Sequence, residues 1–395
     1  MKKLMIIPGS WFQIPAVQYA KSQGYYVITC DYNPENPAHK LSDEYHNVSS
    51  TDGDGLLQLA KELSIDGILC FASDPAAPVA AYVSEKMGLP GNTYDNIRKF
   101  GVKHLWREFL RVNGFNVPRA KSYTSFDQVN LDEWTYPVMV KPVDSCGSKG
   151  ITKVLDKSQM AAAYQYALSF CKSKIILVEE FIERVGPQIG GDGFYGKDRL
   201  EFVCYGDQVV DEGVNGYVPC GMTFPSRIDD GTKERISSEI ERACRLSGLT
   251  NLSFNLEVMI GKDGKIYLME LGPRNGGNCI PEVIGQYTGV NMVALAVEAA
   301  MGKTLPIHPQ SNGDYFAYYA MHSEREGVFQ DYVVSEDFPG EVTSSYIFLK
   351  KGDRIGRFLG SNEEVGVLIL KFHSREAMDR FFAEPTRYIS CDIIY

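Results

Sequence analysis

The sequence predicts an α/β protein whose first domain holds a parallel sheet and whose later parts are of the α+β kind. Short apolar runs alternate with single helical stretches over the first ninety-odd residues, which is typical of parallel strands joined by right-handed crossovers. From about residue 115 onward, strands and helices follow one another in mixed order. The length of 395 residues adds a prediction of two to three domains.

The composition indicates a globular protein with a large core. The chain is 44% hydrophobic and 23% charged, which excludes a mainly disordered protein. Its formal charge of −10 disfavours a nucleic-acid partner but leaves room for a local basic pocket that binds phosphate. No stretch approaches eighteen apolar residues, so we expect no membrane partner and a cytoplasmic location.

The cysteines and histidines do not point to a metal or disulfide framework. Nine cysteines make an odd number, and none forms a C-x-x-C pair. Most of them fall in apolar stretches, which favours buried thiols in a reducing compartment. The six histidines are scattered, so we assign them no metal-binding role.

The first ninety-odd residues predict the parallel sheet in detail. We expect strands at Leu4–Ile7, Tyr25–Cys30 and Gly67–Phe71, and helices at Ala16–Ser22, Gly55–Leu63 and Pro78–Met87. Ligands bind beyond the carboxyl ends of such strands, which places Gly9–Phe12, Asp31 and Ser73–Asp74 at the expected rim of a site. No G-x-G-x-x-G motif follows the first strand, so an NAD-dependent oxidoreductase is disfavoured.

The region after residue 95 begins with a predicted long helix, Asn96–Val112, which carries Lys103 and ends before Gly114 and Pro118. Next we expect strands at Val138–Lys141, Ile151–Val154, Ile175–Glu179, Leu200–Tyr205 and Gln208–Val210, with helices at Ser158–Phe170 and Thr232–Leu246. The stretch up to Ser226 is typical of loops. Residues 303–313 have the composition of a linker, and strands are expected near 345–349 and 366–372 in the smaller tail.

The most informative segment is a predicted hairpin with a carboxylate on each strand. Strand-like runs flank Asp263-Gly264, the preferred dipeptide of a two-residue turn. With those residues in the turn, Glu257 lies directly opposite Glu270, with about 4.5–5.5 Å between the Cβ atoms. The remaining positions, Met269 among them, are expected on an opposite, apolar face.

Two facing carboxylates destabilise a sheet unless something compensates their charge. A Mg²⁺ ion held between the carboxylates and nucleotide phosphates would do so. One glutamate paired with Lys or Arg, or a slipped register, explains the hairpin alone equally well. The loop that follows Glu270 favours the phosphate site, because Gly272–Asn278 offers backbone donors, two asparagines and the guanidinium of Arg274.

Two other segments carry weaker signals for a nucleotide. An apolar strand ends at Lys141 and leads into a Gly/Ser loop, Asp144–Gly150, which lacks the Walker A spacing and is followed by another strand. Such a loop can close over phosphates, although a plain hairpin with a solvated lysine is commoner. The strand that ends at Glu179-Glu180-Phe181-Ile182 could hold an adenine ring, and a solvated strand end explains it equally well.

Taken in order, these segments resemble the ATP-grasp superfamily, specifically carboxylate–amine ligases related to glycinamide ribonucleotide synthetase and the carbamoyl-phosphate synthetase large chain. The resemblance covers nearly the whole chain. It implies an ATP-grasp fold with a Rossmann-like N-terminal domain (1–95), an ATP-grasp domain (96–305) with a mobile lid at about 115–182, and a small C-terminal α+β domain (306–395).

The resemblance also implies roles for single residues. ATP would be held by the two phosphate-binding lysines, the loop over the phosphates and the adenine segment: Lys103, Lys141, Ser145, Gly147, Ser148, Gly150, Glu179, Glu180, Phe181 and Ile182. Glu257 and Glu270 would bind Mg²⁺, or Mn²⁺ in its place. Arg274 would meet the acyl phosphate or the acceptor, which with Lys141 makes it a candidate catalytic residue.

The chain departs from the family at two positions. Many members carry Asn where this chain has Gly272, and the hairpin register pairs Gly272 with Asn255. We therefore hypothesise that Asn255 supplies the missing amide beside the metal. The acid that usually binds ribose is also not evident, and either Gln188 or Asp192 could replace it.

The resemblance implies an ADP-forming ligase that makes an amide through an acyl phosphate. Its partners would be a small-molecule carboxylate and an amine, and a homodimer is compatible with this. A carboxylase-type enzyme that phosphorylates bicarbonate and a non-catalytic nucleotide-binding protein are the alternatives. The presence of both metal-binding acids and both lysines disfavours the second alternative.

Overall fold

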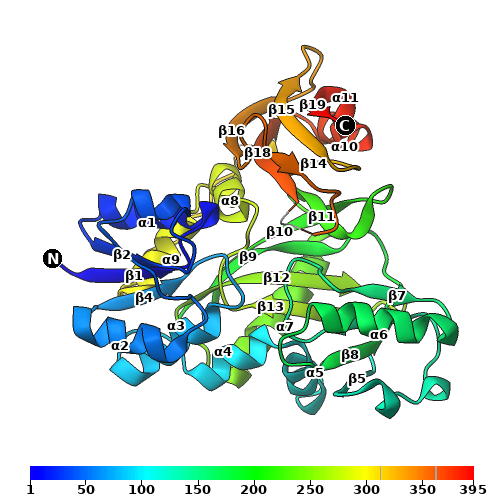
Figure 1. Cartoon of the computed structure of the whole chain (residues 1–395), viewed down its shortest axis with the longest axis horizontal. Coiled ribbons are helices and arrows are strands. Elements are labelled where there is room, and N and C mark those ends of the chain that lie inside the picture. The colour runs from blue at the N-terminus through cyan, green and yellow to red at the C-terminus, as the bar shows by residue number, and fades with distance from the viewer. Residues whose placement is uncertain (312, 361–362) are drawn as a thin grey trace.

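The computed structural model describes residues 1–311, 313–360 and 363–395. Figure 1 shows three lobes around a central sheet: the N-terminal lobe at the left, a small lobe of residues 120–180 at the lower right, and a C-terminal lobe at the top. The mixed α/β architecture predicted from the sequence is confirmed. In the described part of the chain, no helix is long and apolar enough to cross a membrane.

The N-terminal lobe is a parallel sheet with strand order β3-β2-β1-β4. Its elements are β1 (Lys3–Ile7), α1 (Ile14–Ser22), β2 (Tyr26–Cys30), β3 (Glu44–His46), α2 (Gly53–Leu63), β4 (Gly67–Cys70) and α3 (Ala77–Met87). Each predicted strand and helix of this region is present. Helix α9 (Met292–Ala300), far along the chain, completes the lobe because Val293 and Val297 pack into its core.

The predicted helix Asn96–Val112 is wrong as a single element. Two helices stand there, α4 (Tyr94–Gly101) and α5 (Lys103–Val112). Val102 between them is extended, with φ −115° and ψ 114°, and the preceding Gly101 has a low helix propensity. The break places Lys103 at the first turn of α5.

The lobe of residues 120–180, named the lid lobe here after the lid predicted at about 115–182, is an antiparallel sheet of order β5-β8-β6-β7 covered by one helix. Its elements are β5 (Ala120–Tyr123), β6 (Val138–Pro142), β7 (Thr152–Val154), α6 (Met160–Ser169) and β8 (Ile176–Glu180). A core of apolar side chains, including Val140, Tyr164 and Leu177, joins the sheet to α6. The Gly/Ser loop therefore connects two adjacent strands, as predicted.

The central sheet has eight strands in the order β13-β12-β9-β10-β11-β14-β18-β16. They are β9 (Ile189–Tyr195), β10 (Leu200–Asp211), β11 (Asn215–Phe224), β12 (Leu252–Ile260), β13 (Ile266–Gly272), β14 (Tyr315–His322), β16 (Glu341–Ile347) and β18 (Glu364–Phe372). Helices α7 (Asp230–Ser247) and α8 (Ile280–Thr288) accompany it. The expected hairpin of β12 and β13 forms one end of the sheet.

Three strands of this sheet, β9, β10 and β11, differ from the sequence prediction. The two strands expected between residues 200 and 210 are one long strand, β10, and the stretch taken for loops contains β11. Strand β9 was missed because its sequence, IGGDGFY, is rich in glycine. Glycine is required there, since a Cβ on Gly193 would lie 2.3 Å from the ring of Phe254.

The C-terminal lobe adds a second, three-stranded antiparallel sheet to the end of the central one. It contains β15 (Gly327–Val334), β17 (Arg354–Ile355), α10 (Arg375–Ala383), α11 (Pro385–Tyr388) and β19 (Ile389–Ile394). The strands β14, β16 and β18 belong to the central sheet, so the tail is continuous with it through backbone hydrogen bonds.

Candidate active site

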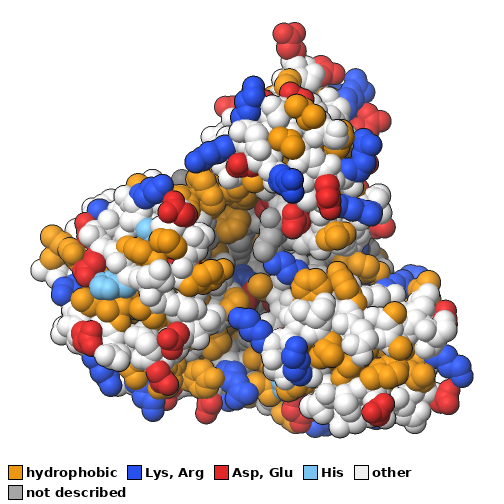
Figure 2. All heavy atoms as spheres, viewed as in Figure 1, with side chains coloured by type: hydrophobic (Ala, Val, Ile, Leu, Met, Phe, Trp, Pro, Cys, Tyr) orange, Lys and Arg blue, Asp and Glu red, His pale blue; other side chains and the backbone are white. Residues whose placement is uncertain are grey.

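A cavity of about 700 Å³ lies where the three lobes meet. In Figure 2 it is the hollow at the centre of the molecule, with Lys and Arg side chains at its rim. Most residues singled out from the sequence line it: Lys103, Lys141, Ser145, Gly147, Ser148, Glu179, Glu180, Phe181, Ile182, Asn255, Glu257, Glu270 and Arg274. Gly150 is the exception: it does not line the cavity, and a Cβ on it would lie 3.1 Å from Phe170 and 3.2 Å from Pro142.

Glu257 and Glu270 are paired across β12 and β13, as the hairpin predicted. The predicted two-residue turn is wrong, however: Gly261 pairs with Lys265, and Ile260 lies opposite Ile266. A bulge between these pairs and the glutamates shifts the register by one residue. The bulge restores the facing carboxylates and turns Met269, expected in the apolar core, toward the cavity.

The bulge is held from outside by helix α5. The indole of Trp106 donates to the carbonyl of Leu268 at 3.0 Å, and the guanidinium of Arg107 donates to the carbonyl of Met269 at 2.6 Å. Strand β13 is the edge of the sheet, so its outward carbonyls have no partner strand and these side chains satisfy two of them. Residues of α5 thereby fix the position of the neighbouring Glu270.

The repulsion within the carboxylate pair appears in the pKa of Glu257. Burial, followed by the charge of Glu270, raises the pKa of Glu257 to about 7. Two amides oppose this effect: Gln188 donates to its Oε2 at 2.9 Å and Gln208 to its Oε1 at 3.3 Å. Because the pair is stable only with a compensating positive charge, the site favours a cation.

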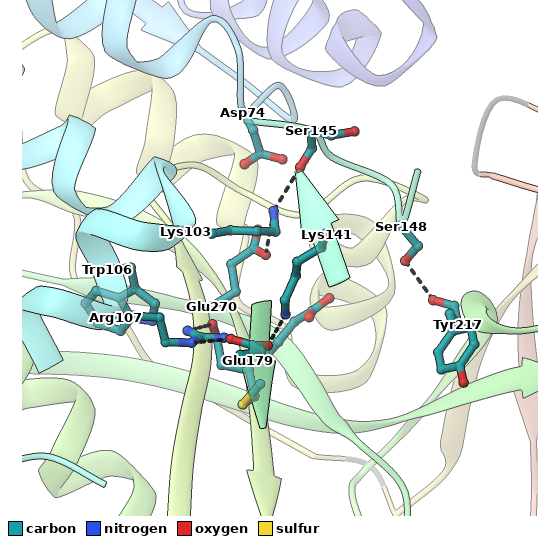
Figure 3. A network of polar contacts seen from close by, with 12 residues as sticks. Asp74, Lys103, Trp106, Arg107, Lys141, Ser145, Ser148, Glu179, Tyr217 and Glu270 are labelled. Atoms are coloured by element: carbon teal, nitrogen blue, oxygen red, sulfur yellow. Dashed lines mark hydrogen bonds and ion pairs between the residues drawn. The ribbon is translucent and has the colours of Figure 1, made fainter. Parts of the chain in front are cut away.

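Lys103 supplies part of that charge. Its Nζ lies 3.6 Å from Oε2 of Glu270 and donates to the carbonyl of Ser145 at 2.8 Å (Figure 3). Burial lowers the pKa of Lys103, but the nearby carboxylates of Glu270 and Asp74 raise it, and the net shift is upward. Lys103 is therefore fully charged and links the carboxylate pair to the Gly/Ser loop.

A second network joins α5 to the lid. The carboxylate of Glu179 is only 1% exposed and accepts from Nε of Arg107 at 2.8 Å. The ammonium of Lys141 forms a close ion pair with the same carboxylate (Figure 3). Two cations thus contact this carboxylate, and its expected contact with adenine stays a prediction. Arg107, which the sequence did not single out, donates to both oxygens of this carboxylate.

The pKa of Lys141 in this network shifts in the opposite direction to that of Lys103. Burial lowers the pKa of Lys141 and the charge of Arg107 lowers it further, while Glu179 raises it, and the net shift is downward. One ammonium hydrogen meets Glu179, which leaves two others for acceptors in the cavity.

The loop of residues 145–150 is tied to the far wall of the cavity. The hydroxyl of Ser148 donates to the carbonyl of Tyr217 in β11 at 2.7 Å (Figure 3). Ser148 has φ +59°, and Gly147 before it and Gly150 two residues after it also have positive φ. Backbone N–H groups in such a turn can converge on an anion, which suits a phosphate.

Arg274 joins the N-terminal lobe to the loop after β13. Its guanidinium donates to Asp74, at the end of β4, and to the carbonyl of Asn275 at 3.0 Å. Asp74 lines the cavity, as its expected place on the rim requires. Asp31, expected on the same rim, instead accepts hydrogen bonds from Gly9 and Asn36 within the N-terminal lobe.

The ion pair explains the departure at Gly272. A Cβ on Gly272 would lie 3.4 Å from both Cζ of Arg274 and Oδ1 of Asp74. The pair thus fills the space that a longer side chain on Gly272 would need.

Asn255 lies opposite Gly272 and faces the cavity, as the hypothesis for it requires. Its amide nitrogen donates to the carbonyl of Gly191 and to Oδ1 of Asp192, both at 2.9 Å. This fixes the amide so that its oxygen is the atom left for a ligand. Asp192 is completely buried and also binds Asn275 and the backbone of Gly276, so of the two ribose candidates Gln188 alone lines the cavity.

The donor set fits a divalent cation that keeps part of its coordination from a nucleotide. Two facing carboxylates, one with a raised pKa, are the ligands that Mg²⁺ prefers. Among the described residues, no group of three or more His, Cys, Asp or Glu side chains could hold a metal. An ion here would therefore complete its shell with phosphate oxygens and water.

Comparisons with known proteins agree with this geometry. Residues 101–278 match the ATP-grasp domain family. The uncharacterized protein y4rH of Sinorhizobium fredii is 24% identical over 370 residues, which cover 89% of this chain and 74% of that protein.

Two solved structures align with all of this chain and with 99% of their own chains. An L-amino acid ligase from Bacillus licheniformis has a TM-score of 0.82 and 21% identity. A phosphoribosylglycinamide synthetase from Anaerococcus prevotii has a TM-score of 0.78 and 22% identity. Residues 101–278 therefore match the ATP-grasp domain family, and the chain as a whole shares the fold of these two proteins.

Proposed function

We propose that this protein is an ATP- and Mg²⁺-dependent ligase that joins a carboxylate to an amine through an acyl phosphate, releasing ADP and phosphate. The observation that carries the proposal is the convergence of Glu257 and Glu270 with Lys103 and Lys141 in one cavity. Two acids for a metal and two ammonium groups for phosphates are what phosphoryl transfer from ATP needs. The shared fold with an L-amino acid ligase and a phosphoribosylglycinamide synthetase supports the same reaction class.

The nucleotide lies between the lid and the central sheet. The adenine ring fits the slot beside the backbone of Phe181 and Ile182, where Met259 and Met269 supply an apolar wall. Lys103 and Lys141 donate to the phosphate oxygens, and the loop at residues 145–150 covers them. Bound Mg²⁺, held by Glu257 and Glu270 with the amide oxygen of Asn255 nearby, would offset negative charge on the phosphates.

The substrate carboxylate lies beside Arg274, across from the γ-phosphate. One of its oxygens attacks phosphorus in line, the bond to the β–γ bridging oxygen breaks, and ADP departs. An amine then attacks the carbonyl carbon, the C–O bond to phosphate breaks, and the amine proton leaves with the phosphate. Closure of the Gly/Ser loop by contacts such as Ser148 to Tyr217 keeps water from the acyl phosphate.

The test is ADP release from ATP and Mg²⁺ across a panel of carboxylates, with hydroxylamine present to trap any acyl phosphate as a hydroxamate. We expect at least one carboxylate to give ADP and hydroxamate in equal amounts. Glu270→Gln should fold normally yet lose about 100-fold or more of this activity. The matched control is Glu239→Gln on α7, whose carboxylate pairs with Arg242 outside the cavity.

Three outcomes would contradict the proposal. ADP release that needs bicarbonate and yields no hydroxamate would point to a carboxylase-type enzyme instead. ATP binding without any product across the panel would indicate a nucleotide-binding protein. Near-normal activity of Glu270→Gln would remove this residue from the metal site.

A further inference from the structure

Most positive charges that line the cavity come from the elements around the proposed nucleotide site. Among the described lining residues, seven have basic side chains: Lys103, Arg107, Lys141, Lys149, Lys153, Arg184 and Arg274. The first six come from α5, the lid and the segment that follows β8. Arg274 comes from the loop after β13 and is paired with Asp74 of the N-terminal lobe.

The charge of Arg274 is already compensated by a carboxylate of the protein. Its Nη2 is bonded to Asp74 and its Nη1 to the carbonyl of Asn275. The ion pair is neutral overall, and the Arg274 side chain is 10% exposed. It can still donate to a monoanionic carboxylate, but a dianionic phosphate ester here would stay largely uncompensated, which is costly in a buried place.

Several apolar side chains line the cavity here, together with the amide of Asn278. Met222, Ile280 and Tyr318 line it and belong to one buried cluster, against which Phe348 of the C-terminal lobe packs. Phe12 of the N-terminal lobe lines the cavity from the other side and meets Phe348 edge-on, with ring centroids 5.5 Å apart. Figure 2 shows hydrophobic side chains at this border between the left-hand and upper lobes.

We propose that the substrate beside Arg274 is a small, unphosphorylated carboxylate that carries an apolar group. Its carboxylate meets Arg274, and its apolar group lies against Phe12, Ile280 and Tyr318. This inference rests on the proposed function, because it names the substrate class of the same site. It separates this chain from ligases whose carboxylate substrate carries a phosphate ester, since such a substrate needs further cations where this cavity has aromatic and aliphatic side chains.

Hydroxamate formation with ATP, Mg²⁺ and hydroxylamine tests the inference with a matched pair of probes. L-Phenylalanine and O-phospho-L-tyrosine share a backbone and an aromatic ring, but only the second carries a phosphate. We expect L-phenylalanine, L-leucine or 3-phenylpropionate to be used at least about tenfold better than O-phospho-L-tyrosine or O-phospho-L-serine, as judged by kcat/KM.

Variants of Phe12 link the preference to the apolar wall. Phe12→Ala should lower kcat/KM for L-phenylalanine about tenfold or more and for glycine by less than about threefold, with the KM for ATP unchanged. Phe12→Leu keeps an apolar side chain, so its kcat/KM for L-phenylalanine should lie between those of the wild-type protein and Phe12→Ala. The control is Trp11→Ala. The ring of Trp11 also contacts Phe348, with ring centroids 5.8 Å apart, but Trp11 does not line the cavity. This variant should therefore keep the preference for L-phenylalanine over the phosphorylated probes.

The outcomes separate this inference from the proposed function. Hydroxamate formation with the phosphorylated probes in preference to the apolar ones would overturn the inference and leave the ligase reaction standing. An equal loss for L-phenylalanine and glycine in Phe12→Ala would also overturn it. If no carboxylate of either kind gave hydroxamate, the inference and the ligase proposal would both fall.

Discussion

The buried ion-pair network of Glu179 gives a prediction that can be worked out in numbers. Burial alone would raise the pKa of the Glu179 carboxyl, but Arg107 and Lys141 lower it from 4.5 to about 2. That difference corresponds to about 3 kcal/mol of folding free energy at neutral pH. Glu179→Gln removes the charge and leaves two buried cations uncompensated, so we expect a loss of about 3–5 kcal/mol.

The effect should depend on pH in a defined direction. A carboxyl whose pKa is lower in the folded than in the unfolded protein stabilises the fold above its unfolded pKa of 4.5. The stabilisation fades as pH falls toward the folded pKa of about 2. The difference between the wild-type protein and Glu179→Gln should therefore be constant above pH 5 and shrink steadily below pH 4.5.

Urea denaturation followed by tryptophan fluorescence is the assay, because Trp106 is buried on α5 next to Arg107. The control is Glu183→Gln, which breaks the exposed pair of Glu183 with Lys262 and should cost less than about 1 kcal/mol. A loss below about 1 kcal/mol in Glu179→Gln, or a loss that does not change between pH 4.5 and pH 2, would refute the reasoning.

Three further changes have expected outcomes. Because the pKa of Glu257 is raised to about 7, its ionisation opposes folding above pH 4.5. Glu257→Gln should therefore have a higher melting temperature than the wild-type protein at pH 8 and the same melting temperature at pH 4.5. The variant should also lose activity. Gly272→Asn should displace the Arg274–Asp74 pair, raising the KM of the carboxylate substrate severalfold, whereas Gly272→Ala should not. Ser148→Ala should free the loop from Tyr217, seen as faster proteolysis within residues 145–150 and a higher KM for ATP.

Each of these has a result that would contradict it. For Glu257→Gln, it is a melting temperature at pH 8 below that of the wild-type protein. For the two Gly272 variants, it is an equal KM for the carboxylate substrate. For Ser148→Ala, it is an unchanged rate of cleavage within residues 145–150. Crystal structures of the Gly272 variants would show directly whether the guanidinium has moved.

The parts of the fold that follow from local patterns could be predicted from the sequence. The alternation of apolar runs and helical stretches identified the parallel sheet, and Asp263-Gly264 located the hairpin. The pairing of Glu257 with Glu270 was also right, although a longer turn and a compensating bulge produce it. A bulge that depends on Arg107 and Trp106 from a distant helix leaves no trace in the hairpin sequence.

Other features depend on tertiary contacts that a single sequence does not reveal. Three of the seven residues of strand β9 are glycines, because neighbouring atoms lie too close for a side chain at those positions, although glycine has a low strand propensity. The ion pairs of Glu179 with Arg107 and Lys141 likewise join segments far apart in the sequence, so the strand that ends at Glu179 does not reveal them. The domain boundaries near residues 95 and 305 stay predictions, since α9 packs into the first lobe and β14 extends the central sheet.

The transfer of oxygen from the carboxylate to phosphate tests the central claim most directly. The carboxylate that gives the most ADP would be labelled with ¹⁸O in both oxygens and incubated with unlabelled ATP, Mg²⁺ and an amine. An acyl phosphate intermediate predicts one ¹⁸O atom in each phosphate released. ADP and phosphate formed at the same rate, with no label in the phosphate, would show that ATP is hydrolysed without activating the carboxylate.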